Sequence, residues 1–376
     1  MASPRWLLVV ALGGWLIAGG IASGARAQIV YGESARGGLN LVSSHWKLAD
    51  DDSEVVIDQW AVPVSAFVPL GENVEARVFV SQATSSVKVA DEDFELDGLS
   101  DLRLQVSGSL ARDQVLLGLG LNLPTGTKEL SLDSEWMVMN YLTQSFLSFP
   151  VRRLGGGLGA NFLAGFARTS GDYRLGASAT LDLSGRYRAY AGEGFYRPGS
   201  SFSLTAGVQN EQPTRVWDAD VTFTTSGKDE LRNTVVFSRG EQLAVHLGLR
   251  GQTSGGRFRG DAIYHVRGRN AIYDPDGILA QQLKIYGNEL LLRGSYDLGR
   301  EGNTWTYGPR AEWHLIASNE FGLGSTSVAG LGAQIARRLG AAFEASLAFN
   351  YFTGSTHGGA IDLSGHQAWL TAGGSF

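Results

Sequence analysis

Residues 99–126, LSDLRLQVSGSLARDQVLLGLGLNLPTG, show most clearly how this chain folds. Apolar side chains occupy every second position from Leu102 to Leu110, and again from Val115 to Leu123. Polar or small residues fill most of the positions between them. Successive side chains of a β-strand point to opposite sides, so this period of two predicts a hairpin with one apolar and one polar face.

The same alternation recurs from about residue 38 to residue 376, in segments close to ten residues long. That length is what a tilted strand needs to cross a bilayer. The sequence therefore predicts an all-β fold, a transmembrane antiparallel up-and-down β-barrel. We expect about 16 strands, with 12 as the lower bound, and one short helical segment near residues 133–147.

The first 27 residues have the pattern of a signal peptide. Arg5 gives a positive start, residues 6–21 are mostly apolar, and Ala25 and Ala27 form an A-x-A cleavage site. A transmembrane anchor is the alternative, and the shortness of the apolar run argues against it. Residues 28–376 are expected to form one outer-membrane β-barrel domain.

The composition agrees with an exported barrel. The chain has no Cys, and therefore no disulfide framework, while Gly is abundant at 51 residues. Its mean hydropathy of −0.05 looks like that of a soluble protein, because a lipid-facing side and a wet side average out. A formal net charge of −6 without a basic tract argues against nucleic-acid binding.

The predicted connections alternate in length. The short ones centre on residues 71, 112, 171, 212, 255, 301 and 339. The others are mostly longer and more polar, among them an acidic connection over residues 85–97. Outer-membrane barrels have short periplasmic turns and longer external loops, so both termini are expected on the periplasmic side.

Charged residues of both signs fall on the inward-facing positions of the predicted strands. A row of like charges would select ions, whereas interleaved charges would pair and stiffen the wall. The mixture of signs favours pairing. The candidates for lining the lumen are Arg77, Asp101, Arg103, Arg174, Asp182, Arg250, Asp261, Arg293, Arg310 and Glu312.

Three histidines, His246, His265 and His314, share the inward phase with acidic residues. No ligand motif links them, so we interpret them as solvated lumen histidines and predict neither a metal site nor a cofactor. No Gly-x-Ser-x-Gly elbow is present, and the sequence predicts no enzyme.

Residues 130–149 lose the period of two. Asp133 is a candidate N-cap for a short helix, and Pro150 would end the segment. The segment is either a helix packed over the rim as structure, or a lid or inserted plug beside a route for an apolar solute. The candidate gate or plug residues are Trp136, Met137, Met139, Tyr141 and Phe146.

Four short motifs carry a resemblance to a known family. They are GLSDL at 98–102, LPTG at 123–126, FPV at 149–151 with LG at 154–155, and YRPG at 196–199. Together they resemble the outer-membrane barrels associated with meta-pathway phenol degradation, a group similar to fatty-acid and aromatic-compound transporters. The resemblance implies transport of hydrophobic small molecules and no catalytic residues.

We therefore expect a channel or transporter in the outer membrane of a Gram-negative bacterium. Small compounds, hydrophobic or aromatic ones among them, would diffuse through its lumen. The alternative is a non-transporting surface or structural protein with a closed lumen and partner-binding loops. Expected partners are membrane lipid and lipopolysaccharide, a small-molecule solute, and the outer-membrane assembly machinery, because the terminal Phe376 resembles its recognition signal.

Overall fold

The computed structural model describes residues 35–111, 114–126, 129–132, 134–299, 304–320, 322, 324–340 and 342–375. The predicted signal peptide, the candidate N-cap Asp133 and the terminal Phe376 lie outside the described residues.

The described chain forms a closed antiparallel β-barrel of 16 strands. β4 and β5 together make one of these strands, because both pair with β3. The barrel closes where β1 pairs with β23, which sets Arg36 opposite Ser375. The predicted fold class is confirmed. The strands are β1 (Arg36–Ala49), β2 (Glu54–Pro69), β3 (Val74–Val89), β4 (Glu92–Leu99), β5 (Leu102–Leu110), β6 (Val115–Leu123), β7 (Gly159–Ser170), β8 (Tyr173–Ser184), β11 (Ser201–Gln212), β12 (Arg215–Ser226), β15 (Gln242–Thr253), β16 (Gly256–Arg267), β19 (Glu289–Leu298), β20 (Trp305–Ile316), β21 (Thr326–Leu339), β22 (Phe343–Thr356) and β23 (Ile361–Ser375).

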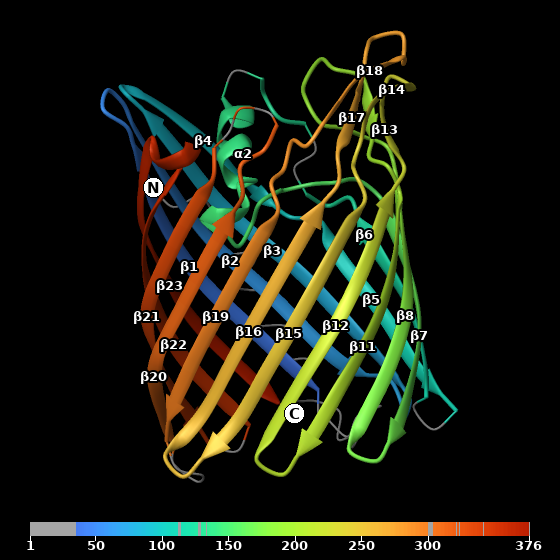
Figure 1. The fold of residues 1–376 in the computed structure, drawn as a ribbon, viewed down its shortest axis with the longest axis vertical. Helices are drawn as coiled ribbons and strands as arrows, with labels where there is room; N and C mark the ends of the chain where they lie inside the picture. The colour runs from blue at the N-terminus through green and yellow to red at the C-terminus, as the bar shows by residue number, and fades with distance from the viewer. Residues whose placement is uncertain are drawn as a thin grey trace.

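The two ends of the barrel differ. Tight turns gather at the lower end in Figure 1, where the chain also ends after β23. Because Arg36 pairs beside Ser375, the described chain enters the barrel at that same end. The upper end carries the long connections and the helical segment. This arrangement agrees with short periplasmic turns and longer external loops.

The outer face of the barrel is apolar. Large side chains there remain exposed in the isolated chain, which is what a lipid-facing surface requires. Examples on different strands are Leu119, Phe162, Leu247, Leu331 and Phe349, each between 45% and 71% exposed. Among the described residues, the helices are all too short or too polar to span a membrane.

The prediction of an acidic connection over residues 85–97 is wrong, because most of these residues belong to two paired strands. β3 continues to Val89, a two-residue turn follows at Ala90, whose φ is +52°, and β4 then runs back along β3. Here the apolar side chains point inward and the polar ones outward: Val87 and Leu96 are at most 1% exposed. In a lipid-facing strand the apolar side chains point outward, so here the two faces are exchanged. For this reason the sequence pattern did not predict the two strands.

The barrel wall has two irregularities. The pairing of β3 shifts by one residue between Gln82–Leu99 and Phe79–Arg103, so Ser100 and Asp101 form a bulge. The second is at Pro63, which interrupts the ladder between β1 and β2 without shifting the register. Its missing N–H accounts for the interruption.

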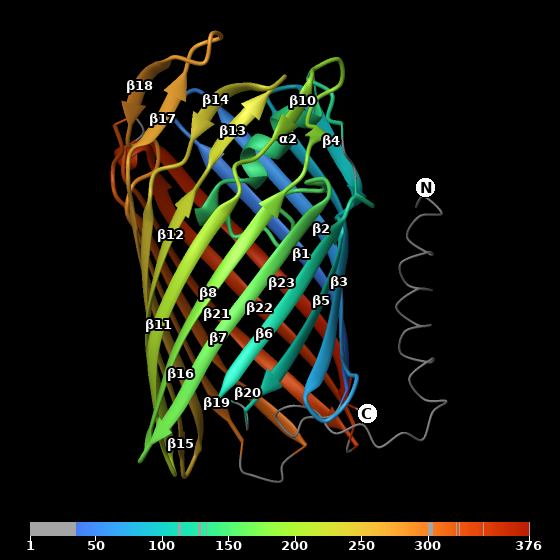
Figure 2. The ribbon, with the colours of Figure 1, turned by 90° about the vertical axis from the view of Figure 1, so that its right-hand side faces the viewer.

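Three connections predicted as loops build a second, six-stranded sheet above the barrel, visible at the top of Figure 2. Tyr196 donates a hydrogen bond to Asp229, which also accepts from the Gly199 backbone at 2.6 Å. Burial and the neighbouring Asp229 carboxylate raise the pKa of Tyr196. The strands are β9 (Tyr187–Arg188), β10 (Phe195–Arg197), β13 (Lys228–Leu231), β14 (Thr234–Ser238), β17 (Asn270–Tyr273) and β18 (Leu279–Leu283).

The expected helical segment is present but shorter than predicted. It consists of α2 (Glu135–Leu142) and the 3-10 turn η1 (Ser145–Leu147). Ser131 and Glu135 form reciprocal side-chain to backbone hydrogen bonds of 2.7 and 3.2 Å at the start of α2, which supply polar partners to its first turn. A second 3-10 turn, η2 (His357–Gly359), joins β22 to β23.

Candidate functional site

The chain between β6 and β7, residues 124–158, folds into the barrel instead of away from it; we call it the inserted segment. In Figure 1 its helix α2 lies within the upper mouth, next to β4. Contacts place α2 against β3 and β4. The barrel wall and the segment inside it are the two parts of the candidate site.

The inserted segment packs its apolar side chains against one side of the inner wall. Val138, Leu142, Leu147 and Leu154 are at most 2% exposed. They belong to one core with inward-facing residues of β1 to β4 and β21 to β23. The wall residues of this core are Val42, Trp46, Leu48, Ile57, Ala61, Ala83, Val87, Leu96, Val328, Phe352 and Leu363.

Two glutamines of the wall bind the backbone of the inserted segment. The buried Gln59 amide donates to the Val151 carbonyl at 2.7 Å and accepts from the Val151 N–H at 3.1 Å. Gln367, on the other side of β1, donates to the carbonyls of Leu147 and Ser148 at 3.2 and 3.1 Å. These bonds hold the segment to the wall at two places.

Asp101 joins the two ends of the inserted segment. Its carboxylate accepts the Gly126 N–H at 2.9 Å, the Gly156 N–H at 2.6 Å and the Asn122 side-chain amide at 2.8 Å. The side chain faces inward, but it is covered by the segment and only 5% exposed. Asp101 is therefore an anchor of the segment and does not line open lumen.

The candidate gate residues divide by burial. Phe146 is buried in the core, and Met139 and Tyr141 pack against it half-buried. Met137 is half-buried, and Trp136 remains 41% exposed. Burial also raises the pKa of Tyr141. The residues that hold the segment most firmly, Leu147 among them, were missed because a helical apolar pattern cannot show which turn will meet the wall.

Paired charges cover the opposite side of the inner wall, on β12 to β20. Side chains directly across a strand pair share a face, so the register carries the inward phase from strand to strand. Most of the inward-facing arginines on these strands form an ion pair with an aspartate or a glutamate. The ion pairs on this side join Arg250 to Asp218 (3.1 Å), Arg259 to Asp261 (3.0 Å), Arg293 to Glu312 (2.8 Å) and Arg267 to Glu289. Arg77 pairs with Glu75 at 3.0 Å on β3, outside this side of the wall.

Other inward arginines form no ion pair with a carboxylate in the described part of the chain. Arg103 lies over the Phe79 ring, 6.0 Å from its centre, and Arg310 lies 5.7 Å from the centre of Trp369. Arg174 lines a hollow in the wall beside Asp218. Asp182, also on the inward face, instead accepts from Asn161 at 2.5 Å.

The inserted segment adds two arginines of its own. Arg152 is exposed and lies within electrostatic reach of Glu289 and Arg293 on β19. Arg153 lies over the Tyr187 ring, 4.8 Å from its centre. Enclosure by the surrounding protein lowers the pKa of both side chains, yet a guanidinium stays charged at neutral pH. Arg152 thus brings positive charge toward the wall that carries the ion pairs, whereas Arg153 lies beside β9.

The three inward histidines do not share one environment. His314 is only 3% exposed and contacts Glu289 at 2.5 Å, so its prediction as a solvated histidine is wrong. His265 is more exposed and lies 3.9 Å from Glu289. His246 lies apart from both, beside Asp218 and Asp220.

No protein-family model matches this chain, and no curated protein sequence does. The likeness to barrels of meta-pathway phenol degradation therefore stays a prediction. Among solved structures, Pseudomonas aeruginosa OccK7 (OpdD) is 13% identical with a TM-score of 0.45, covering 90% of this chain and 99% of that chain. Acinetobacter baumannii OccAB4 is 8% identical with a TM-score of 0.46, covering 91% and 98%.

The CymD monoaromatic hydrocarbon channel is 12% identical with a TM-score of 0.43, covering 92% of this chain and 89% of that one. With identities of 13% or less and TM-scores of 0.46 or less, we take nothing about function from these three structures.

Proposed function

We propose that the protein is a passive outer-membrane channel for small organic anions, aromatic carboxylates among them. The observation that carries this proposal is the orientation of the inserted segment. Its apolar side chains pack against one wall, while Arg152 and Arg153 remain on the open side. A solute that passes the segment therefore meets guanidinium groups first.

The inner wall supports the same class of solute. A purely hydrophobic compound would have to pass paired and unpaired charges, which favour water over an apolar group. Arg103 and Arg310 lie over aromatic rings and form no ion pair with a carboxylate among the described residues, although Glu312 and Asp297 lie within electrostatic reach of Arg310. A guanidinium can bind a carboxylate through two parallel hydrogen bonds, and a neighbouring ring can contact an aromatic solute.

The test is ion conduction by the refolded protein in planar lipid bilayers. We expect ohmic channels whose reversal potential in a KCl gradient shows a preference for chloride. Added benzoate should reduce the chloride current, and benzyl alcohol, which has no charge, should not. Cation preference, or equal effects of the two compounds, would contradict the proposal.

Deleting most of the inserted segment distinguishes a channel from a non-transporting surface protein with a closed lumen. Gly126 and Gly156 bind the same Asp101 carboxylate, so a short glycine linker can replace residues 127–155. A channel narrowed by the inserted segment should then conduct more. A barrel that conducts nothing in either form would be a non-transporting surface protein.

A further inference from the structure

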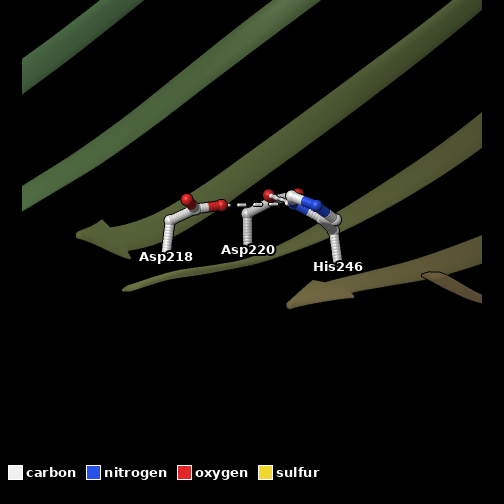
Figure 3. A group of neighbouring side chains, drawn as sticks. All are labelled: Asp218, Asp220 and His246. Carbon is white, nitrogen blue, oxygen red and sulfur yellow. Dashed lines mark hydrogen bonds and ion pairs between the residues drawn. The ribbon is translucent and has the colours of Figure 1, made fainter. Parts of the chain in front are cut away.

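Asp218, Asp220 and His246 form a compact group on the inner wall, away from the inserted segment. The two aspartates lie on the same face of β12, and His246 is directly across from Asp220 on β15. Figure 3 shows the three side chains directed toward one another. His246 Nδ1 is 2.9 Å from Asp220 Oδ2 and 3.5 Å from Asp218 Oδ2. We propose that these residues bind a divalent transition-metal ion in the lumen wall.

The donor set points to this class of ion. One ligand atom from each residue lies within 4.8 Å of the others, so one ion can contact all three after small rotations. One imidazole nitrogen with two carboxylate oxygens suits Zn²⁺ and its neighbours in the first transition row. Ca²⁺ and Mg²⁺ prefer oxygen ligands throughout. Three protein ligands also leave a coordination position open to water or a solute.

The surroundings of His246 match those of a metal-binding histidine. Asp261, on β16, lies on the other side of the ring, with Oδ1 3.5 Å from Nε2. An ion on Nδ1 leaves the Nε2 hydrogen directed at this carboxylate, an arrangement that fixes the tautomer and the ring of metal-bound histidines. Arg259 holds the other oxygen of Asp261 at 3.0 Å.

The charges around the group favour a cation. Arg250 contacts Oδ1 of Asp218 at 3.1 Å and leaves Oδ2 facing His246. Arg259 likewise pairs with Asp261, and Arg174 lines the hollow beside Asp218 without an ion pair to it, whereas Asp220 forms no ion pair with an arginine among the described residues. With a neutral imidazole, a bound divalent ion would offset the negative charge of Asp220.

Two glycines keep the space for these carboxylates. Gly248 lies directly across from Asp218, and a Cβ there would be 2.5 Å from Asp218 Oδ2. Gly207 lies across from Asp220, and a Cβ there would be 3.0 Å from the Asp220 Cβ. A hollow of about 450 Å³ opens beside the pair and gives an ion and its water ligands access from the lumen.

The test is Zn²⁺ titration of the folded, untagged barrel by isothermal calorimetry, with Co²⁺ absorption as a second probe of the nitrogen ligand. We expect one Zn²⁺ per chain. His246→Asn and Asp220→Asn should each weaken binding at least tenfold. Gly248→Ala should do the same, because its methyl group displaces the Asp218 carboxylate. Asp261→Asn should weaken binding by about 10–100-fold, as loss of a carboxylate behind a metal-bound histidine does.

His265→Asn is the matched control, since His265 is another inward histidine beside a single carboxylate. It should leave Zn²⁺ affinity unchanged. Unaltered affinity in His246→Asn, or no stoichiometric binding by the wild-type barrel, would overturn the proposal. Folding of each variant is checked by the heat-dependent change in gel migration, and Asp218→Asn replaces any variant that does not fold. None of these measurements depends on an ion current. The metal-site proposal can therefore be refuted without affecting the channel proposal, and the channel proposal can be refuted without affecting the metal site.

Discussion

Asp101 binds both ends of the inserted segment, through the backbone N–H groups of Gly126 and Gly156. Asp101→Ala removes the acceptor of two part-buried backbone N–H groups, those of Gly126 and Gly156, and one of the two acceptors of the Asn122 amide. An unpaired group costs about 1–3 kcal/mol when it is buried. We expect the free energy of unfolding to fall by about 3 kcal/mol in a urea titration in lipid vesicles. We also expect the inserted segment to become sensitive to added protease.

Asp182→Ala is the control for this change. Asp182 also lies on the inward face and accepts from Asn161 and Ser201, but it has no hydrogen bond to the inserted segment in the described structure. Its loss should lower stability and leave the segment protected. Equal protease sensitivity in the two variants would show that Asp101 does not anchor the segment.

Arg103 tests the contribution of an unpaired charge to selectivity. Arg103→Gln removes one positive charge from the lumen, and its field reaches over a Debye length of about 10 Å at 0.1 M salt. We expect the ratio of chloride to potassium permeability, measured from reversal potentials, to fall by about twofold. Arg215→Gln makes the same charge change at the exposed first residue of β12, next to the turn, and should leave that ratio unaltered. A twofold change in both would mean that only net charge matters.

The inserted segment behaves as one element that docks on the wall through its apolar side chains. Leu147 is 0% exposed and Leu132, at the other end of the helical part, is 51% exposed. Leu147→Ala should weaken docking by about 2–5 kcal/mol, the usual cost of removing a buried leucine side chain. The measurement is the rate of proteolysis of the segment together with the current noise of single channels.

Leu132→Ala removes the same atoms from an exposed position of the same segment. It should change neither the proteolysis rate nor the current noise. If both substitutions act alike, the packing of the segment against β1 to β4 does not control its position.

The whole barrel is a two-sided wall, with lipid on one side and an enclosed interior on the other. Leu347 and Ser346 are neighbours on β22 that face opposite sides, Leu347 being 49% exposed outward. Leu347→Arg places a charge in lipid and should lower the free energy of unfolding by about 2 kcal/mol. Ser346→Arg places the same charge in the interior and should cost less than half of that. The check is a denaturant titration of both variants folded into vesicles, and equal losses would refute the assignment of faces.

Much of the barrel could be predicted from the amino-acid pattern because strand alternation is local. From Leu102 to Leu110 and from Leu158 to Phe166, every second residue is apolar since a lipid environment tolerates nothing else there. The short turns near 171, 212 and 255 were predicted for the same reason: each interrupts a pattern of period two. Of the ten charged residues predicted to line the lumen, five form ion pairs in the described structure: Arg77, Arg250, Asp261, Arg293 and Glu312.

The inside of the upper barrel was decided by tertiary structure. Val87, Leu96 and Trp46 point inward because the inserted segment covers them, so the rule that apolar means lipid-facing reverses there. The role of Asp101 and the meeting of Asp218, Asp220 and His246 depend on which strands become neighbours and on where a distant segment folds back. The sequence alone determined which residues alternate along each strand, since that depends only on the backbone and the solvent on each side. Only the closed barrel decided what fills its interior, because contacts between residues far apart in the chain exist only after the wall has curved around them.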